Sequence, residues 1–319
     1  MAERRLTMER LSWPFYAHGS QESSTILGKL AILLSELLDN IISTCCDIQN
    51  TVASFSPVNR GARNAVDESL AFQRVSHYAP DALAAMLRTQ AGSFFTLEDL
   101  YNALCRSSSC FSCGSSGSLI WLLECRRCCM PCLRSPELLP INEYAATKVF
   151  GVSAATLAGL PTVCSESGWG EYLDFRRLLS FTKVRAVAVE DAGGEAQLMA
   201  RINSTAQRRE AYESYMSRRV ITDKKLHARW MVAAPLPYFN RRSGQIDNDG
   251  LSCLGCQRAF HSDGTYDDEG YYEVYRRYDT VYTIPDLIEH VRTDCPKGQR
   301  IWKKYLKESK QRNEHNTTE

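Results

Sequence analysis

Apolar side chains recur at helical spacing between residues 33 and 42 and form one wide stripe. Asp47 is placed to cap a second short helix, and Ser56 followed by Pro57 predicts the start of a third. Three short helices within about thirty residues bury too little surface to be stable alone. We therefore expect this unit to need a partner or the rest of the chain. The stripe consists of Leu33, Leu34, Leu37, Leu38, Ile41 and Ile42.

Helical patterns continue between residues 66 and 104. Thr96 and Asp99 stand three positions apart at the start of the last helical run, which is the spacing of a capping box. The run 119–123 is short, apolar and free of Gly and Pro, so it predicts a strand. Because the last helix leads directly to Cys110, we expect it to anchor the cysteine-rich stretch that follows.

The second half of the chain mixes shorter patterns. Residues 144–150 favour a short helix, and the alternation across 183–190 predicts a strand. Residues 195–219 predict one long polar helix whose charges form a solvated face. Residues 235–239 indicate an extended segment, and 247–250 indicate a turn. These elements predict a mainly α fold with small β elements, of the α+β class.

Length, charge and cysteine content limit the number of modules and the classes of function that this chain can have. A chain of 319 residues is long for one core and suggests about two or three modules. Lys and Arg number 38 against 37 Asp and Glu, which argues against a protein whose main task is gripping phosphate backbones. Thirteen cysteines without a recognisable secretory leader indicate the cytoplasm or the nucleus, with metal binding as their main use. No apolar run is long enough to predict a membrane span.

Six cysteines stand in three closely spaced pairs, Cys110–Cys113, Cys125–Cys128 and Cys129–Cys132. Two intervening residues let one tight turn point two sulfurs at the same place, and two such turns complete a tetrahedral zinc shell. The first two pairs give the simplest zinc ribbon, or a treble-clef-like cluster. The third pair replaces the second if Cys129 and Cys132 open a helix. Disulfides or buried thiols are the alternative, although adjacent Cys128 and Cys129 suit disulfides poorly.

A second candidate metal group lies near the C-terminus. Cys253 and Cys256 are followed much later by His290 and Cys295, which resembles the order of ligands in a two-Cys, His-Cys zinc finger. The gap between the two pairs is wider than in a compact finger. His261 is a rival ligand, and plain exposed thiols are the alternative reading. The chain is thus expected to hold one or two structural Zn²⁺ ions.

The N-terminal helical pattern resembles an F-box. The resemblance rests on the run L-L-S-E-L-L-D-N-I-I from Leu33 and on V-N-R from Val58, although Leu34 stands where that family has proline. F-boxes dock on the Skp adaptor of cullin-RING ubiquitin ligases. The alternative is an amphipathic helical hairpin packed on the rest of the protein. The resemblance implies apolar contacts, shared between adaptor and internal core, from Leu33, Leu37, Leu38, Ile41, Ile42 and Val58.

The order of blocks sharpens this resemblance. An F-box, further helices, a C-x-x-C-G turn and a C-x-x-C-C-x-x-C run together resemble a group of fungal F-box proteins, closely so from Leu33 to Cys132. The expected organisation is a flexible tail at 1–24, an F-box at 25–66, a helical segment with the cysteine cluster at 67–165, a strand and long-helix region at 166–245, a zinc-finger-like module at 246–296 and a basic tail at 297–319.

The sequence gives little support to an enzyme. It contains no P-loop, G-x-S-x-G elbow, H-E-x-x-H run or Gly-rich dinucleotide turn. The resemblance implies a non-catalytic F-box substrate receptor that binds the Skp adaptor and cullin complex through residues 33–65 and a protein substrate through its zinc-stabilised body. The alternative is a zinc-containing nucleic-acid-binding or transcription-related protein.

Overall fold

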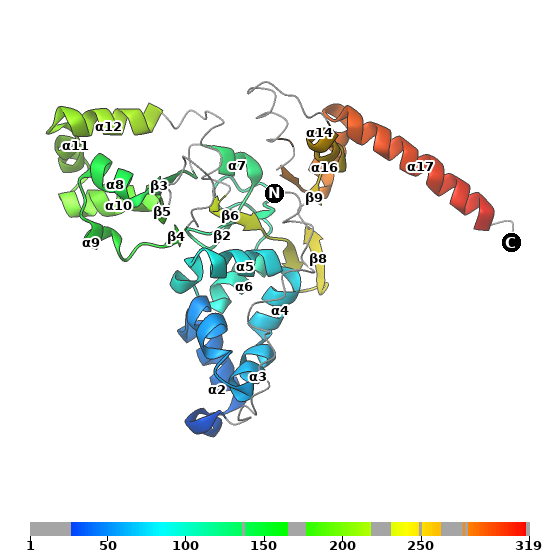
Figure 1. Cartoon of the computed structure of the whole chain (residues 1–319), viewed down its shortest axis with the longest axis horizontal. Helices are drawn as coiled ribbons and strands as arrows, with labels where there is room; N and C mark the ends of the chain where they lie inside the picture. The colour runs from blue at the N-terminus through cyan, green and yellow to red at the C-terminus, as the bar shows by residue number, and fades with distance from the viewer. Residues whose placement is uncertain are drawn as a thin grey trace. The chain divides into compact units, whose positions relative to one another are not determined.

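The computed structural model describes residues 27–135, 138–164, 177–217, 231–248, 251–262, 277 and 280–316 (Figure 1). The chain divides into two compact units, Met1–Asn102 and Ala103–Glu319. Most of the regular structure is helical, and the four small sheets among these residues are antiparallel. The expected mainly α class with small β elements is confirmed. The tail expected at 1–24 lies outside the described residues.

The first unit is built from short helices, and α6 continues across its boundary. Within the described part of the chain, no helix has the length and apolar content that crossing a bilayer requires. In chain order the helices are η3 (Gly28–Ile32), α2 (Ser35–Asn40), η4 (Ile41–Cys45), η5 (Gln49–Phe55), α3 (Arg60–Glu68), α4 (Leu70–Tyr78), α5 (Pro80–Arg88), η6 (Ala91–Phe94) and α6 (Leu97–Cys105).

Local side-chain bonds fix where these helices start. Asp47 accepts a 2.8 Å hydrogen bond from the Asn50 N–H, as its predicted capping role requires. The Thr96 hydroxyl accepts from the Asp99 N–H at 3.1 Å, and the Asp99 carboxylate accepts from the Thr96 N–H at 2.8 Å. The predicted capping box is thus confirmed. The predicted start of a helix at Ser56 and Pro57 is wrong, because Asn59 caps α3.

The first sheet of the second unit carries the cysteine-rich stretch. Strands β1 (Leu119–Trp121) and β2 (Arg126–Cys128) form a hairpin, and β6 (Ala233–Pro235) pairs with the other edge of β1. The strand predicted at 119–123 is therefore confirmed for its first three residues. Helix α7 (Met130–Arg134) follows the hairpin directly.

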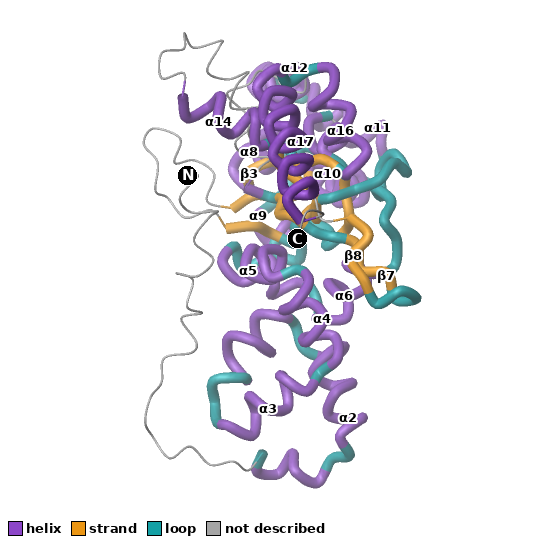
Figure 2. The backbone as a smooth tube through the Cα atoms, turned by 90° about the vertical axis from the view of Figure 1, so that its right-hand side faces the viewer, coloured by secondary structure: helices purple, strands orange, loops and turns teal. Residues whose placement is uncertain are grey.

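A helical layer packs against the second sheet, whose strand order is β3-β5-β4 (Figure 2). Its apolar core includes Phe150, Phe181 and Val184, with Tyr212 and Tyr215 packed against it. The strands are β3 (Pro140–Asn142), β4 (Thr162–Cys164) and β5 (Arg177–Ser180), and the helices are α8 (Glu143–Phe150), α9 (Ala154–Leu157), α10 (Phe181–Ala192), α11 (Glu195–Asn203) and α12 (Ala206–Ser217).

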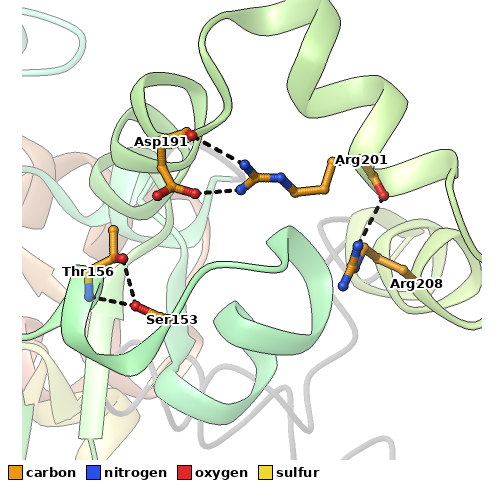
Figure 3. Close-up of polar contacts among 5 residues, drawn as sticks. All are labelled: Ser153, Thr156, Asp191, Arg201 and Arg208. Carbon is orange, nitrogen blue, oxygen red and sulfur yellow. Dashed lines mark hydrogen bonds and ion pairs between the residues drawn. The ribbon is translucent and has the colours of Figure 1, made fainter.

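Two predictions for this region are wrong. Residues 183–190 are helical within α10, where Val184 and Ala188 stand four apart and are both buried. The predicted long helix at 195–219 breaks after Asn203 into α11 and α12, and residues 218–219 lie outside the described part. Two arginines connect α10, α11 and α12 through polar contacts (Figure 3). Arg201 binds the Asp191 carboxylate at 2.6 Å, and Arg208 donates to the Arg201 carbonyl at 3.2 Å.

The described residues of the C-terminal part form two further antiparallel strand pairs and three helices. The turn predicted at 247–250 is wrong for its first two residues, which belong to a strand, and its last two lie outside the described residues. The strands are β7 (Tyr238–Asn240) with β8 (Gln245–Asn248), and β9 (Leu251–Ser252) with β10 (Val281–Tyr282); the helices are α14 (Leu254–Ser262), α16 (Ile284–Thr293) and α17 (Pro296–Asn316).

Arg127 ties several of these elements together from within the second unit. Its side chain is buried, and its two terminal nitrogens donate to backbone carbonyls of α6, of the loop before β1 and of the segment between β6 and β7. Burial lowers the pKa of Arg127 to about 10, so the guanidinium remains charged near neutral pH. The five acceptors, at 2.6 to 3.1 Å, are the carbonyls of Ala103, Leu104, Gly117, Leu236 and Pro237.

We expect Arg127→Ala to lower the free energy of unfolding by about 3–5 kcal/mol, because it leaves five carbonyls without these donors. Arg126→Ala is the matched control. Arg126 is the neighbouring residue on the exposed side of β2 and lies over the Phe111 ring at 4.3 Å, so its loss should cost under about 1 kcal/mol. Urea unfolding of both variants measures the difference, and equal losses would contradict this role of Arg127.

Candidate metal centres

Four sulfurs of the cysteine-rich stretch meet at one place. They belong to Cys110, Cys113, Cys129 and Cys132, and all lie within 4.8 Å of one another. Three of these cysteines are buried, whereas Cys113 is exposed. The first pair comes from the loop after α6, and the second pair comes from the start of α7. The β1–β2 hairpin connects the two pairs and brings them back to the same point.

The first pair sits in a tight turn. The Gly114 N–H donates to the Cys110 carbonyl at 2.9 Å, and Gly114 has a φ of +76°. A side chain is strained in this left-handed conformation, so glycine is favoured directly after the second cysteine. The Phe111 N–H donates to the Arg127 carbonyl at 2.9 Å. This bond fastens the turn to β2 and therefore to the buried arginine.

The second pair opens α7. Cys129 is the N-cap residue, and its sulfur accepts from the Cys132 N–H at 3.5 Å. Across the group, the sulfurs of Cys113 and Cys129 are 3.5 Å apart. The structure thus brings together the alternative set in which the third pair opens a helix.

The simplest ribbon, which uses Cys125 and Cys128, is not the set that the structure brings together. Cys125 sits at the tip of the hairpin with a φ of +49°, after β1 has ended. Cys128 lies within β2, is fully buried and pairs with Leu119 across the ladder. The hairpin therefore places both residues outside the four-sulfur group. Burial raises the pKa of the Cys128 thiol, which favours its neutral form.

The cysteines of the first group differ in how readily their thiols ionise. Hydrogen bonds from Ser115 lower the pKa of the exposed Cys113 thiol to about 6. Burial raises the pKa of Cys132 to about 11 and also raises the pKa of Cys129. The raised pKa values keep Cys129 and Cys132 as neutral thiols near neutral pH. A metal ion that binds here would displace their protons, so all four sulfurs could then act as thiolate ligands.

The second group combines three sulfurs and one imidazole. Cys253, Cys256, His290 and Cys295 are all buried, and their ligand atoms lie within 4.8 Å of one another. Cys253 directly precedes α14 and Cys256 lies in its first turn, while His290 belongs to α16 and Cys295 directly precedes α17. Every residue predicted for this site is present in the group. The side chain of His261, the rival ligand, lies outside the described ones.

The distances in both groups fit a tetrahedral zinc shell. Zn–S bonds of about 2.3 Å place two sulfurs about 3.8 Å apart, and a sulfur and a ring nitrogen about 3.6 Å apart. The Cys295 sulfur lies 3.6 Å from that of Cys253 and 3.7 Å from that of Cys256. The Cys256 sulfur lies 3.2 Å from the His290 Nε2. These groups could each hold a metal ion, and four ligands leave no coordination position open for a substrate.

Contacts around the second group hold its ligands in place. The Gly298 N–H donates to the Cys295 sulfur at 3.2 Å, and the His290 ring stacks on Tyr282 with centroids 4.6 Å apart. A proton shared with Cys256 lowers the pKa of Cys253 to about 5. These partners orient the ligands before any ion binds, which is the role that neighbouring groups play in metal sites.

An exposed apolar surface lies on the first unit. Leu38 and Ile42 are buried in the core, so they contribute to internal packing rather than to a partner. Leu33 is half-buried. The other three members of the predicted contact set, Leu37, Ile41 and Val58, are exposed, and so is Leu34, which belongs to the apolar stripe but not to that set. These four, called here the α2 surface, are Leu34 (67% exposed), Leu37 (52%), Ile41 (37%) and Val58 (67%).

Two important features were missed from the sequence. Arg127 was not recognised, although neighbouring residues in a strand point to opposite faces, so covering one face of β2 buries either Arg126 or Arg127. Gly255, within the second C-x-x-C, was not singled out either. A Cβ there would lie 2.3 Å from the Gly298 nitrogen and 2.7 Å from the Cys295 sulfur. The backbones of α14 and α17 therefore approach one another at this glycine.

Comparisons with protein-family models, with curated proteins and with solved structures each found no match to this chain. The two ligand groups and the α2 surface therefore carry the functional proposal.

We expect purified protein to contain about two zinc ions per chain, a number set by four ligands at each site. Cys132→Ser and Cys295→Ser should each remove about one ion by taking away one ligand. Cys125→Ser is the control, because Cys125 lies outside both groups, and it should leave the zinc content unchanged. Elemental analysis checks these values. The assignment would be contradicted if Cys125→Ser lost zinc, or if well-folded wild-type protein contained no zinc.

Gly255→Ala should empty the second site while sparing the first, because its methyl group meets both the α17 backbone and a ligand sulfur. We expect the zinc content to fall from about two ions per chain to about one. Gly159→Ala is the matched control, since a Cβ at Gly159 meets nothing within 4 Å. A Gly255→Ala protein that keeps its full zinc content would show that α14 and α17 do not meet at this glycine.

Proposed function

We propose that this protein is a non-catalytic substrate receptor of a cullin-RING ubiquitin ligase. In this proposal the α2 surface binds the Skp adaptor, and the second unit, stabilised by two structural Zn²⁺ ions, binds the protein to be modified. The proposal joins the F-box resemblance of residues 33–60 to the exposure pattern of the same residues. It needs no catalytic group in this chain.

The observation that carries the proposal is the two-faced burial of the first helical segment. Leu38 and Ile42 stand four residues apart and are buried, whereas Leu37 and Ile41, the neighbouring row, are exposed. A hairpin that merely packs on its own unit would bury its apolar row and present polar groups to water. Two adjacent apolar rows, one inside and one outside, are typical of a helix that also contacts a partner.

The closed metal groups support a structural role for the second unit. Four protein ligands at each site leave no position for a metal-bound water, which zinc hydrolases require. Binding of zinc to such groups contributes to the free energy of folding. The second unit is therefore suited to present a fixed surface, and a fixed surface is what a receptor needs to recognise one protein among many.

We expect the wild-type protein to co-purify with the Skp adaptor and the double variant Leu37→Asp/Ile41→Asp to lose it by at least about 100-fold. Removing two buried apolar contacts of about 1.5–3 kcal/mol each accounts for that loss. Leu70→Asp is the matched control, because Leu70 is 50% exposed in the same unit but lies on α4. Quantitative pull-down measures retention. Equal retention by the double variant, or no adaptor with folded wild-type protein, contradicts the proposal.

A further inference from the structure

Helix α17 presents a continuous exposed face. Its start is anchored, since Gly298 is buried against Cys295, and Figure 1 shows the helix continuing past α14 and α16. From Trp302 to Glu308 every side chain is exposed. Three of these are large and apolar: Trp302 (55% exposed), Tyr305 (53%) and Leu306 (43%). Most helices in proteins are stabilised by packing of an apolar face, and this part of α17 packs little against its own unit.

The apolar side chains of this face follow helical spacing. Ile301, Trp302, Tyr305 and Leu306 recur at intervals of three and four residues, so they line one side of the helix. The rings of Trp302 and Tyr305 stack on one another with centroids 5.9 Å apart and an interplanar angle of 23°. This arrangement is the seam that a helix offers to a second helix. We call these four residues the α17 stripe.

Positive charge surrounds the α17 stripe. Residues 296–316 contain seven Lys and Arg and two Glu, although the chain as a whole carries a net charge of only +1. Lys304 lies 3.8 Å from Glu308 and is thus partly neutralised. By the helical period, Lys303 borders the stripe beside Leu306 and Lys304 borders it beside Ile301, whereas Arg300 and Lys307 lie on the opposite side of the helix. The face therefore combines an apolar centre with a basic rim.

We propose that the α17 stripe binds an acidic amphipathic helix of a partner protein. An apolar row in such a helix packs on the stripe, and its flanking Asp and Glu side chains meet the basic rim. This mode of helix recognition is read through anchors at helical spacing. The inference deepens the proposed function by naming the class of substrate segment, and it rests on that function only for the identification of the partner as a substrate.

Charge decides against a second copy of this chain. Two copies that met through α17 would oppose one basic rim with another, and like charges across an interface are unfavourable. Nucleic acid also fits less well. The aliphatic side chains of Ile301 and Leu306 offer no surface for base stacking, and Trp302 and Tyr305 already stack on each other. A protein helix uses all four side chains.

The test measures direct binding to the full-length, zinc-loaded protein without any adaptor. The probe is a synthetic 21-residue peptide with Leu at the a and d positions of a heptad and Glu at e and g. We expect this peptide to bind with a dissociation constant in the micromolar range and to bind at least about tenfold more weakly in 0.5 M salt. The same peptide with Lys in place of Glu should not bind.

Variants identify the surface. Trp302→Ala/Leu306→Asp and, separately, Lys303→Glu/Lys304→Glu should each weaken binding at least about tenfold. Tyr144→Ala is the matched control, because Tyr144 is a 72% exposed aromatic on α8 with Lys148 lying 5.4 Å from its ring. It should leave binding unchanged. Circular dichroism and zinc content show that each variant is folded.

Several outcomes overturn the proposal. Failure of the acidic peptide to bind does so, as does equal binding by the lysine peptide or by the stripe variants. Tighter binding of a single-stranded oligonucleotide, lost in the same variants, would assign the face to nucleic acid. Because no adaptor is present, failure here leaves the adaptor-binding proposal standing, and failure of the adaptor pull-down leaves this one standing.

Discussion

A buried guanidinium organises the region around the first metal group. Removing a cation from water is costly unless its donors find acceptors, and both terminal nitrogens of Arg127 donate to carbonyl oxygens, whereas its buried Nε has no hydrogen-bond partner among the residues that the structure describes. The carbonyls of Ala103 and Leu104 belong to the last turn of α6, where the helix carries partial negative charge. One side chain thereby fixes the end of a helix, the loop before β1 and the segment after β6.

The same arginine supports the first cysteine group through its backbone. The Phe111 N–H, within the turn that holds Cys110 and Cys113, donates to the Arg127 carbonyl. The buried side chain fixes Arg127 in β2, and the backbone bond fixes the turn to Arg127. A change that displaces β2 at this residue is therefore expected to displace the first cysteine pair as well.

The second ligand group lies where the described residues of the C-terminal module have few buried apolar side chains. Among those residues, the buried cluster comprises Cys253, Cys256 and Cys295, with Tyr282, Leu287 and Val291 partly buried against it. A small apolar cluster offsets little of the entropy lost on folding. A metal ion held by the four ligands would crosslink α14, α16 and the start of α17, so its binding is expected to contribute to the free energy of folding.

Features whose interacting residues lie close together in the chain could be predicted from the sequence, whereas features that join distant segments could not. The capping box at Thr96 and the cap at Asp47 were found because both partners lie within three residues. The segment 183–190 was misread because Val and Ala at alternate positions satisfy a strand as well as a helix. Its helix is set by the Ser180 cap and by Gly193, whose φ is +85°. The choice among three cysteine pairs with the same internal spacing, and the role of Gly255, depend on contacts between segments far apart in the chain.

Helices α2 and α17 each have an apolar row that is exposed to solvent. Exposed apolar rows promote nonspecific association unless a partner covers them. On α2 the exposed row stands beside a buried one, so the sequence alone showed a single wide stripe and could not divide it. On α17, lysines beside the apolar row would favour an acidic partner over a basic one. The two rows lie in separate units. In the proposed function, each row therefore binds a partner of its own, because a receptor that links an adaptor to a substrate needs two separate surfaces.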